Sequence, residues 1–333
     1  MSPSKSLEEV RHVLSHYAFV ADRIEPLGGA GGFSGAEFWR VYEQDSVWCL
    51  RCWPTPHPSR DRLQFIHGVL KSVARRGLEV VPVPLPTQKS ETFVSSGRHL
   101  WELARWMPGS PASRTSLSTA QLTAAMRCLA TFHVHAAEDQ QSVGTAPGIV
   151  ERSGRIRELQ GGMLLRIQEA CKLPPWPKLA SRVDPIMFAF HEHAAGVLRE
   201  LLRAEQLRAA VQPCIRDIWS DHVLFTEDEV TGLIDFGAMR LDHVTADIAR
   251  LLGSLASDEK EARQAAIETY TRTRTLSNEE QLLLKTYDES STLLSGMNWL
   301  QWICLERRQF PDHQRVLQRL DEIIQRLGSL RVA

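Results

Sequence analysis

Two carboxylates that flank a short predicted hairpin could carry out phosphoryl chemistry. Asp217 lies five residues before the predicted strand pair, and Asp235 lies at its end, directly before Phe236 and Gly237. Because the two ends of a hairpin meet, we expect both carboxylates at the same open end of the hairpin. Phosphoryl transfer uses such a pair: one carboxylate receives or orients the proton of the substrate hydroxyl, and the other holds the metal that bridges the phosphates.

A glycine-rich segment near the N-terminus could bind phosphate groups. Five glycines fall between Gly28 and Gly35, where the missing Cβ atoms let backbone amides approach phosphate oxygens closely. A predicted strand follows this segment, and the chain has no Gly-Lys-Ser/Thr sequence, which disfavours the Rossmann fold and the P-loop. A glycine loop that joins two antiparallel strands is instead typical of kinases, and an ordinary turn is the simpler alternative.

The predicted elements form a small strand-rich lobe, residues 1–107, and a larger, mostly helical lobe, residues 108–333, which is an α+β fold. Apolar periodicity, capping boxes and turn residues define these elements. In the first lobe we expect helices near 7–17 and 60–76 and strands at 37–42, 47–53, 92–95 and 100–106. In the second lobe we expect strands at 222–226 and 230–235 and helices near 118–137, 151–172, 184–205, 245–256, 258–273, 278–306 and 312–328.

Three motifs in order resemble the aminoglycoside phosphotransferase-like family, which also includes choline and homoserine kinases and has a protein-kinase-like fold. The family's His-Gly-Asp run matches Ile215-Arg216-Asp217, and the Asn downstream of that run matches His222. Its Asp-Phe-Gly element matches Asp235-Phe236-Gly237, and its Asp-Leu-Ala-Arg stretch matches Asp247-Ile248-Ala249-Arg250. The resemblance extends from about Val20 to the region of Trp299–Trp302.

The resemblance implies ATP as co-substrate, Mg²⁺ as cofactor and a role for each acid. Asp217 is the expected catalytic residue, Asp235 the expected magnesium ligand, and Asp247 the residue that braces the catalytic loop. His222 replaces the family's second oxygen ligand, and imidazole suits softer metals better than magnesium. Either Asp221 or water then supplies the missing oxygen, or one metal binds, or His222 contacts a phosphate.

The expected nucleotide contacts lie in the first lobe. Arg51 stands where the family has a phosphate-binding Lys, and Arg can bind phosphate bidentately, although an exposed strand Arg is the simpler alternative. The Glu that usually pairs with this cation from the following helix is missing, and Gln64 could bond Arg51 instead. The link between the lobes would pair with adenine. The full set of expected contacts is Gly29, Gly31, Gly32, Ser34, Gly35, Arg51, Ala104 and Trp106.

An acceptor pocket is expected on the helical lobe. Asp288, Trp299 and Trp302 fall on one helical face, where an acid beside two Trp rings would suit a cationic acceptor. Aromatic core packing is the alternative interpretation.

His133 and His135 are two residues apart on a predicted helix, so their side chains diverge and we expect a structural role.

Composition and charge indicate which partners and which cellular location to expect. The 333 residues carry 39 Lys+Arg and 40 Asp+Glu, a net charge of -1 that provides no global attraction to nucleic acid or to an anionic membrane. No apolar stretch approaches the roughly 20 residues of a membrane span, the N-terminus lacks the core of a signal peptide, and we expect a cytoplasmic protein. The sequence indicates no particular oligomeric state.

We therefore interpret the chain as an ATP-dependent small-molecule kinase that transfers the γ-phosphoryl group to a hydroxyl. The alternative is a pseudokinase that senses nucleotide or acts as a scaffold, because the strand Lys, its helix Glu and the metal-site Asn are all replaced. A protein kinase is disfavoured because no Ala-Pro-Glu landmark follows Asp247.

Overall fold

The structure is a computed structural model that describes residues 5–28, 35–112, 117–138, 140–256, 259–310 and 312–330. The chain divides into two compact units. The first unit consists of Met1–Cys128 and Asp221–Met239, and the second consists of Leu129–Ser220 and Arg240–Ala333. The first unit therefore extends past the expected boundary at residue 107 to Cys128, and it also includes the hairpin that ends near Asp235.

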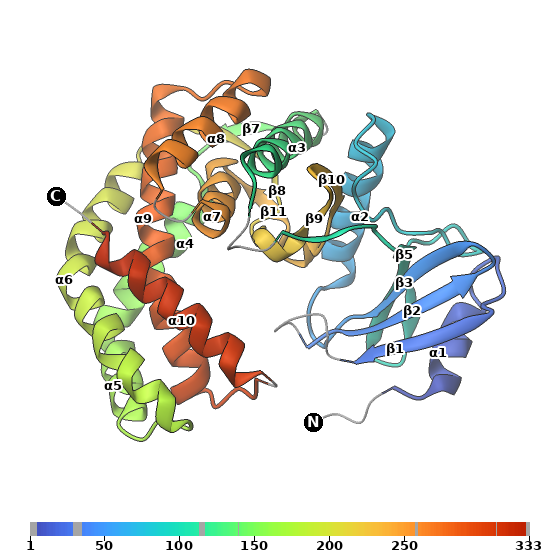
Figure 1. Cartoon of the computed structure of the whole chain (residues 1–333), viewed down its shortest axis with the longest axis horizontal. Helices are drawn as coiled ribbons and strands as arrows, with labels where there is room; N and C mark the ends of the chain where they lie inside the picture. The colour runs from blue at the N-terminus through green and yellow to red at the C-terminus, as the bar shows by residue number, and fades with distance from the viewer. Residues whose placement is uncertain are drawn as a thin grey trace. The chain divides into compact units, whose positions relative to one another are not determined.

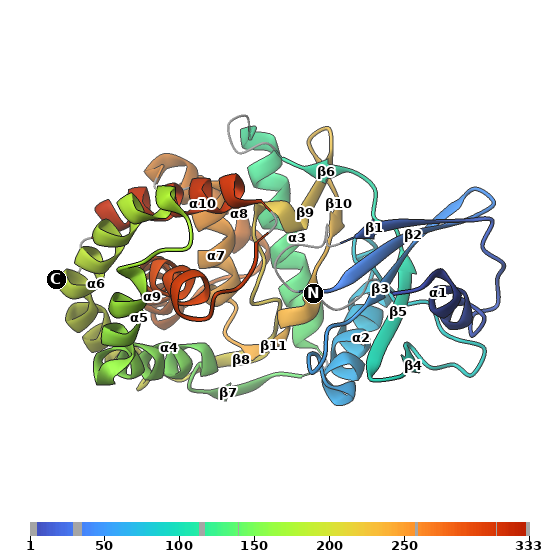
Figure 2. The same cartoon turned by 90° about the horizontal axis from the view of Figure 1, so that it is seen from below.

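The first unit contains a five-stranded antiparallel sheet with the order β1-β2-β3-β5-β4. Helix α1 lies on one face of this sheet and helix α2 on the other (Figures 1 and 2). Ser6 caps α1 and Ser59 caps α2, each accepting a backbone N–H three residues on. The elements are α1 (Leu7–Leu14), β1 (Arg23–Gly28), β2 (Glu37–Glu43), β3 (Ser46–Cys52), α2 (Arg60–Arg75), β4 (Val94–Ser96) and β5 (His99–Arg105).

The two faces of this sheet differ in chemistry because strand side chains alternate. Trp39, Leu50 and Trp101 point to the α1 side and form a core with Val10 of that helix. The rings of Trp39 and Trp101 stack with centroids 5.2 Å apart. The opposite face, toward α2, carries polar side chains, including that of Arg51.

A second, three-stranded sheet explains why the hairpin joins the first unit. Its strands are β6 (Ser110–Pro111), β9 (Val223–Thr226) and β10 (Glu229–Leu233), in the order β10-β9-β6. The N–H of Leu233 also donates to the carbonyl oxygen of Val80 at 2.6 Å. These bonds tie the end of β10, and therefore Asp235, to the N-terminal part of the chain.

The second unit is mostly helical. Helix α9 packs against α6, α7 and α10 and lies among them in Figure 2. Helix α3 (Thr119–Ala137) begins in the first unit and ends in the second. The remaining helices are α4 (Pro147–Glu158), α5 (Leu164–Cys171), α6 (Ala180–Ala204), α7 (Thr245–Leu255), α8 (Lys260–Thr273), α9 (Asn278–Leu300) and α10 (His313–Gly328), and a small sheet consists of β7 (Ser142–Gly144), β8 (Ala209–Cys214) and β11 (Arg240–Asp242).

The second unit differs from expectation in two of its helices and in its small sheet. The helix expected over 151–172 is interrupted by a π-helical turn at Leu159–Met163, where Gly162 has a φ of 124°. The helix expected to reach residue 306 becomes π-helical at Gln301–Leu305. None of the three strands of the small sheet was expected: β7 and β11 have only three residues each, and Gln212 and Pro213 weaken the strand pattern of β8.

No helix in the described part of the chain is both long enough and apolar enough to cross a bilayer.

Two glycines with positive φ provide a test of the sheet that holds the hairpin. Gly109 has a φ of 93°, and a Cβ there would lie 2.6 Å from the carbonyl oxygen of Phe225. Gly97 has a φ of 57° and nothing within 4 Å of such a Cβ. Gly97→Ala should therefore cost only the backbone strain, about 1–2 kcal/mol. Gly109→Ala should destabilise by a further 1–3 kcal/mol, roughly, because of the added overlap.

Urea denaturation of the two glycine variants and the parent measures this difference. Equal losses of unfolding free energy in both variants would contradict the tight packing of β6 against β9.

Candidate functional site

Asp235 occupies a strained position at the end of β10. Its φ is 60°, in the left-handed region, and it precedes a 3₁₀ turn at Phe236–Ala238. The N–H of Ile234 donates to the carbonyl oxygen of His222 at 3.0 Å, which fixes the strand end beside the start of the hairpin. Non-glycine residues in this backbone region are concentrated at functional sites, because the surrounding structure must over-determine them.

The carboxylate of Asp235 lies between two cationic or potentially cationic groups. Nη2 of Arg51 donates to its Oδ1 at 3.0 Å, and Nε2 of His222 lies 3.6 Å from its Oδ2. Burial acts to raise the pKa of Asp235, but the charges of Arg51 and His222 outweigh burial and hold the pKa below its ordinary value. Asp235 is therefore an ionised carboxylate, as a metal ligand requires.

Arg51 is buried on the α2 side of the sheet. Its guanidinium carbon lies 3.4 Å from the ring centroid of Trp53 and 5.1 Å from that of Phe38. Its Nε–H has no hydrogen-bond partner among the described residues. A guanidinium held between rings with an unused donor suits an anion such as phosphate. The alternative of an exposed strand Arg is wrong, because only 7% of Arg51 is exposed.

The missing helix acid has a replacement that sequence reasoning did not find. Glu102 of β5 is directly opposite Arg51 in the strand register, and Nε2 of His67, from α2, lies 2.7 Å from Oε2 of Glu102. Burial acts to raise the pKa of Glu102, but the hydrogen bond from His67 and the charges of His67 and Arg51 keep it lowered. The helix thus contributes a His that orients a strand Glu, and among the described residues Arg51 bonds Asp235 and not the expected Gln64.

The other expected nucleotide contacts have mixed outcomes. Gly29, Gly31, Gly32 and Ser34 lie outside the described residues. Gly35 has a φ of 75°, which favours glycine. Ala104 lies opposite Cys49 and also forms a bridge with Pro84. The N–H of Trp106 donates to the carbonyl oxygen of Val47 at 2.9 Å, so this sheet bond already uses the donor that adenine would need.

In the second unit, Asp217 extends from a loop with a fixed backbone. The loop begins at the end of β8, and Asp247 at the start of α7 accepts the N–H groups of Ile215 at 2.7 Å and Arg216 at 2.6 Å. Arg216 has a φ of 66°, so these two bonds hold a strained conformation. Asp247 therefore braces the loop that carries Asp217, as expected from the family motif.

The side chain of Asp217 remains accessible while its backbone is held. Its carboxylate is 44% exposed and forms an ion pair with Arg250 of α7, which is 35% exposed. A carboxylate that is partly open to solvent and oriented by a cation can accept a proton or orient a hydroxyl group.

The expected acceptor residues are not brought together as one pocket. Asp288 pairs with Arg263 at 2.8 Å and with Arg326 at 2.9 Å, so its charge is already offset. Eleven residues separate Asp288 from Trp299, which is about 16 Å along a helix. Trp299 is buried against Trp302, with ring centroids 5.3 Å apart, and Trp302 lies in the π-helical turn. The cationic pocket expected from these residues is not supported, and core packing describes Trp299.

The family model described as the phosphotransferase enzyme family matches residues 25–281. A comparison with curated proteins gave no match. Among solved structures, the chain resembles a spectinomycin phosphotransferase in complex with ADP and spectinomycin, with a TM-score of 0.67 at 13% identity over 98% of this chain and 99% of that one.

Two other solved structures show the same fold. An amicoumacin kinase in complex with AMP-PNP, Ca²⁺ and Ami has a TM-score of 0.67 at 13% identity over 96% of this chain and 94% of that one. A microcompartment-associated aminopropanol kinase has a TM-score of 0.63 at 15% identity over 98% and 100%, respectively. These likenesses support the expected α+β fold, with an antiparallel sheet in the N-terminal part and helices in the C-terminal part.

The ion pair between Arg51 and Asp235 predicts a pH-dependent stability difference. Asp235 has a pKa below its ordinary 3.8, so its stabilising contribution is present above that pH and is lost as the pH falls below it. At pH 7, Arg51→Met should be less stable than the parent by about 1.5–3 kcal/mol. This gap should be unchanged at pH 5 and should shrink when urea denaturation is repeated at pH 4 and 3.

Arg40→Met is the matched control for the ion pair, because Arg40 also lies over a Trp ring, that of Trp106, at 4.1 Å. The stability gap of this control should not follow the titration of Asp235. A gap for Arg51→Met that is constant from pH 7 to pH 3 would show that the ion pair does not stabilise the fold.

Proposed function

This chain belongs to the phosphotransferase enzyme family, which makes it a small-molecule kinase, and we propose that it transfers the γ-phosphoryl group of ATP to a hydroxyl group of its substrate. The observation that carries this proposal is the loop of Asp217, whose backbone is fixed by Asp247 while its carboxylate stays accessible. Phosphoryl transfer depends mainly on positioning and charge stabilisation, and a fixed loop with an accessible acid supplies the positioning.

Asp217 acts on the acceptor in this proposal. The substrate hydroxyl oxygen attacks the γ-phosphorus, the bond from that phosphorus to the oxygen of ADP breaks, and the hydroxyl proton passes to Asp217. Arg250 keeps Asp217 oriented through their ion pair. Because the transition state is loose, with little bonding to the attacking oxygen, the carboxylate needs to orient the hydroxyl more than it needs to be a strong base.

Asp235 is the residue that would hold the divalent cation that the family uses with ATP. Its ionised state fits a metal ligand, and His222 beside its Oδ2 supplies a nitrogen where magnesium prefers oxygen. The described donors therefore fit one cation on Asp235, with water completing its ligands. A bound divalent cation would neutralise charge on the ATP phosphates.

Arg51 contributes to phosphate binding in the first unit. Glu102 and Asp235 keep its guanidinium in place, while its Nε–H is a spare donor. We propose that this unit holds the nucleotide and that the second unit presents Asp217 to the acceptor.

An inactive nucleotide-binding protein is the second candidate function. It is favoured by one observation: Asp235 is already neutralised by Arg51 and faces His222, so a cation must compete for its carboxylate.

Asp217→Asn should reduce kcat by a factor of about 10² to 10⁴ and leave ATP affinity nearly unchanged, because Asn keeps the shape but lacks the charged acceptor that orients the hydroxyl and takes its proton. ADP release with a pooled set of hydroxyl-bearing metabolites provides the assay. Asp228→Asn, in the exposed turn between β9 and β10, is the matched control and should retain full activity. Parent-like turnover in Asp217→Asn would exclude the proposed role.

A thermal-shift titration with ATP, with and without MgCl₂, separates the two candidate functions. At a ligand concentration of about 100 times Kd, binding should add about 2.7 kcal/mol of stability. A shift that requires Mg²⁺ and disappears in Asp235→Ala is expected for the kinase. A shift that is independent of metal, together with no ADP release, would favour the inactive nucleotide-binding protein.

A further inference from the structure

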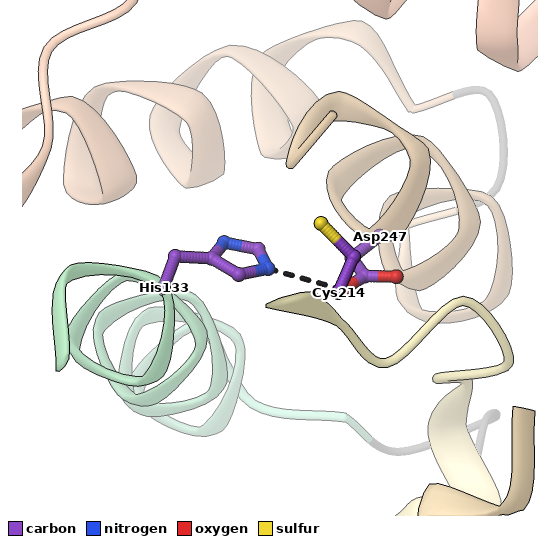
Figure 3. A group of neighbouring side chains, drawn as sticks. All are labelled: His133, Cys214 and Asp247. Carbon is purple, nitrogen blue, oxygen red and sulfur yellow. Dashed lines mark hydrogen bonds and ion pairs between the residues drawn. The ribbon is translucent and has the colours of Figure 1, made fainter. Parts of the chain in front are cut away.

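A buried cluster of three side chains lies directly behind the catalytic loop of the second unit. It consists of His133 from α3, Cys214 at the end of β8 and Asp247 from α7 (Figure 3). All three side chains are buried, and their polar atoms lie within 4.8 Å of one another. Figure 3 shows the imidazole of His133 pointing from its helix toward Asp247. The expectation of a purely structural His133 overlooked this contact.

The cluster does not have the chemistry of a metal site. Both carboxylate oxygens of Asp247 already accept N–H groups of the loop. Burial, with the nearby charges of Asp247 and Asp242, raises the pKa of the Cys214 thiol well above its ordinary value. A protonated thiol does not bind metal well, and Sγ of Cys214 instead donates to the carbonyl oxygen of Asp242 at 3.3 Å.

The hydrogen bonds of His133 have only one consistent direction. Asp247 is an acceptor, so Nε2 of His133, 3.0 Å from its Oδ2, carries the proton. Nδ1 of His133 then accepts from the hydroxyl of Tyr270 at 2.8 Å. Burial lowers the pKa of His133 despite the opposing effect of Asp247, so the ring is neutral and each nitrogen has one role.

We infer that His133 is a positioning residue for phosphoryl transfer, because its Nε2–H holds the Asp247 oxygen that fixes the backbone before Asp217. The kinetic part of this inference rests on the proposed function. Oδ2 of Asp247 is shared between His133 and the N–H of Ile215, so rotation of the carboxylate would move the loop. Without the imidazole, nothing else among the described contacts holds this oxygen on the α3 side.

One further hydrogen bond makes the position of His133 itself well defined. The side chain of Gln212 in β8 donates to the backbone carbonyl oxygen of His133 at 2.6 Å. This bond ties α3 to the strand that leads into the loop. The left-handed Arg216 then sits between a fixed strand end and a fixed carboxylate, so a small displacement of Asp247 is passed directly to Asp217.

Three substitutions of His133 test whether the Nε2 donor is what matters. His133→Leu removes the donor while keeping apolar bulk. A glutamine amide can reach the position of Nε2, whereas an asparagine amide reaches only that of Nδ1. Tyr270→Phe removes a buried hydroxyl from the same cluster but leaves the donor to Asp247, and it is the matched control.

The kinetic expectation is a selective loss of kcat. His133→Leu and His133→Asn should lower kcat by about 10- to 100-fold, with KM for ATP nearly unchanged, because the nucleotide contacts lie in the other unit. His133→Gln and Tyr270→Phe should retain most of kcat. A parallel loss in Leu and Gln variants, or parent-like kcat in His133→Leu, would overturn the inference.

Hydrogen exchange of the peptide spanning residues 212–218 tests the same inference without turnover. The amides of Ile215 and Arg216 should exchange at least about tenfold faster in His133→Leu and at the parent rate in His133→Gln. A parent protein that transfers no phosphate but shows this pattern would refute the proposed function alone. Parent-like exchange in the folded Leu and Asn variants would overturn the role of His133. Where the Leu variant does not fold, the Gln and Asn pair decides.

Discussion

The buried carboxylate of Asp247 is the group on which the functional part of the second unit depends. Moving an ion into a protein interior costs several kcal/mol unless donors replace its water. Here the donors are the backbone N–H groups of Ile215 and Arg216 and the imidazole of His133. The dependence is mutual, because the carboxylate needs the loop to satisfy its charge and the strained loop needs the carboxylate to keep its shape. Asp217 is positioned as a consequence.

The first unit uses a series of alternating charges to hold its cation. His67 orients Glu102, Glu102 lies opposite Arg51, and Arg51 pairs with Asp235. Each group in this series lowers the cost of burying the next one. A planar guanidinium suits this position, because it can pair with Asp235 while lying opposite Glu102 in the strand register.

The acid and the aromatic residues of α9 belong to the framework of the second unit. Asp288 links α9 to Arg263 of α8 and to Arg326 of α10, and Trp299 contributes to the core. A fold preserved at 13% identity is consistent with this, because packing requires apolar volume and satisfied charges rather than particular residues. The residues that we propose for phosphoryl transfer lie instead in a few loops.

The sequence by itself determined the α+β class and most of the helices, because caps and periodicity are local properties, and motif spacing singled out Asp217, Asp235 and Asp247 as candidate acids. Tertiary structure alone decided their partners. Arg51 and Asp235 are 184 residues apart and His133 and Asp247 are 114 apart, so no local pattern indicates that they meet. Such contacts depend on which faces of the helices and strands pack together. Burial then fixes the charge state of each group and the direction of each hydrogen bond.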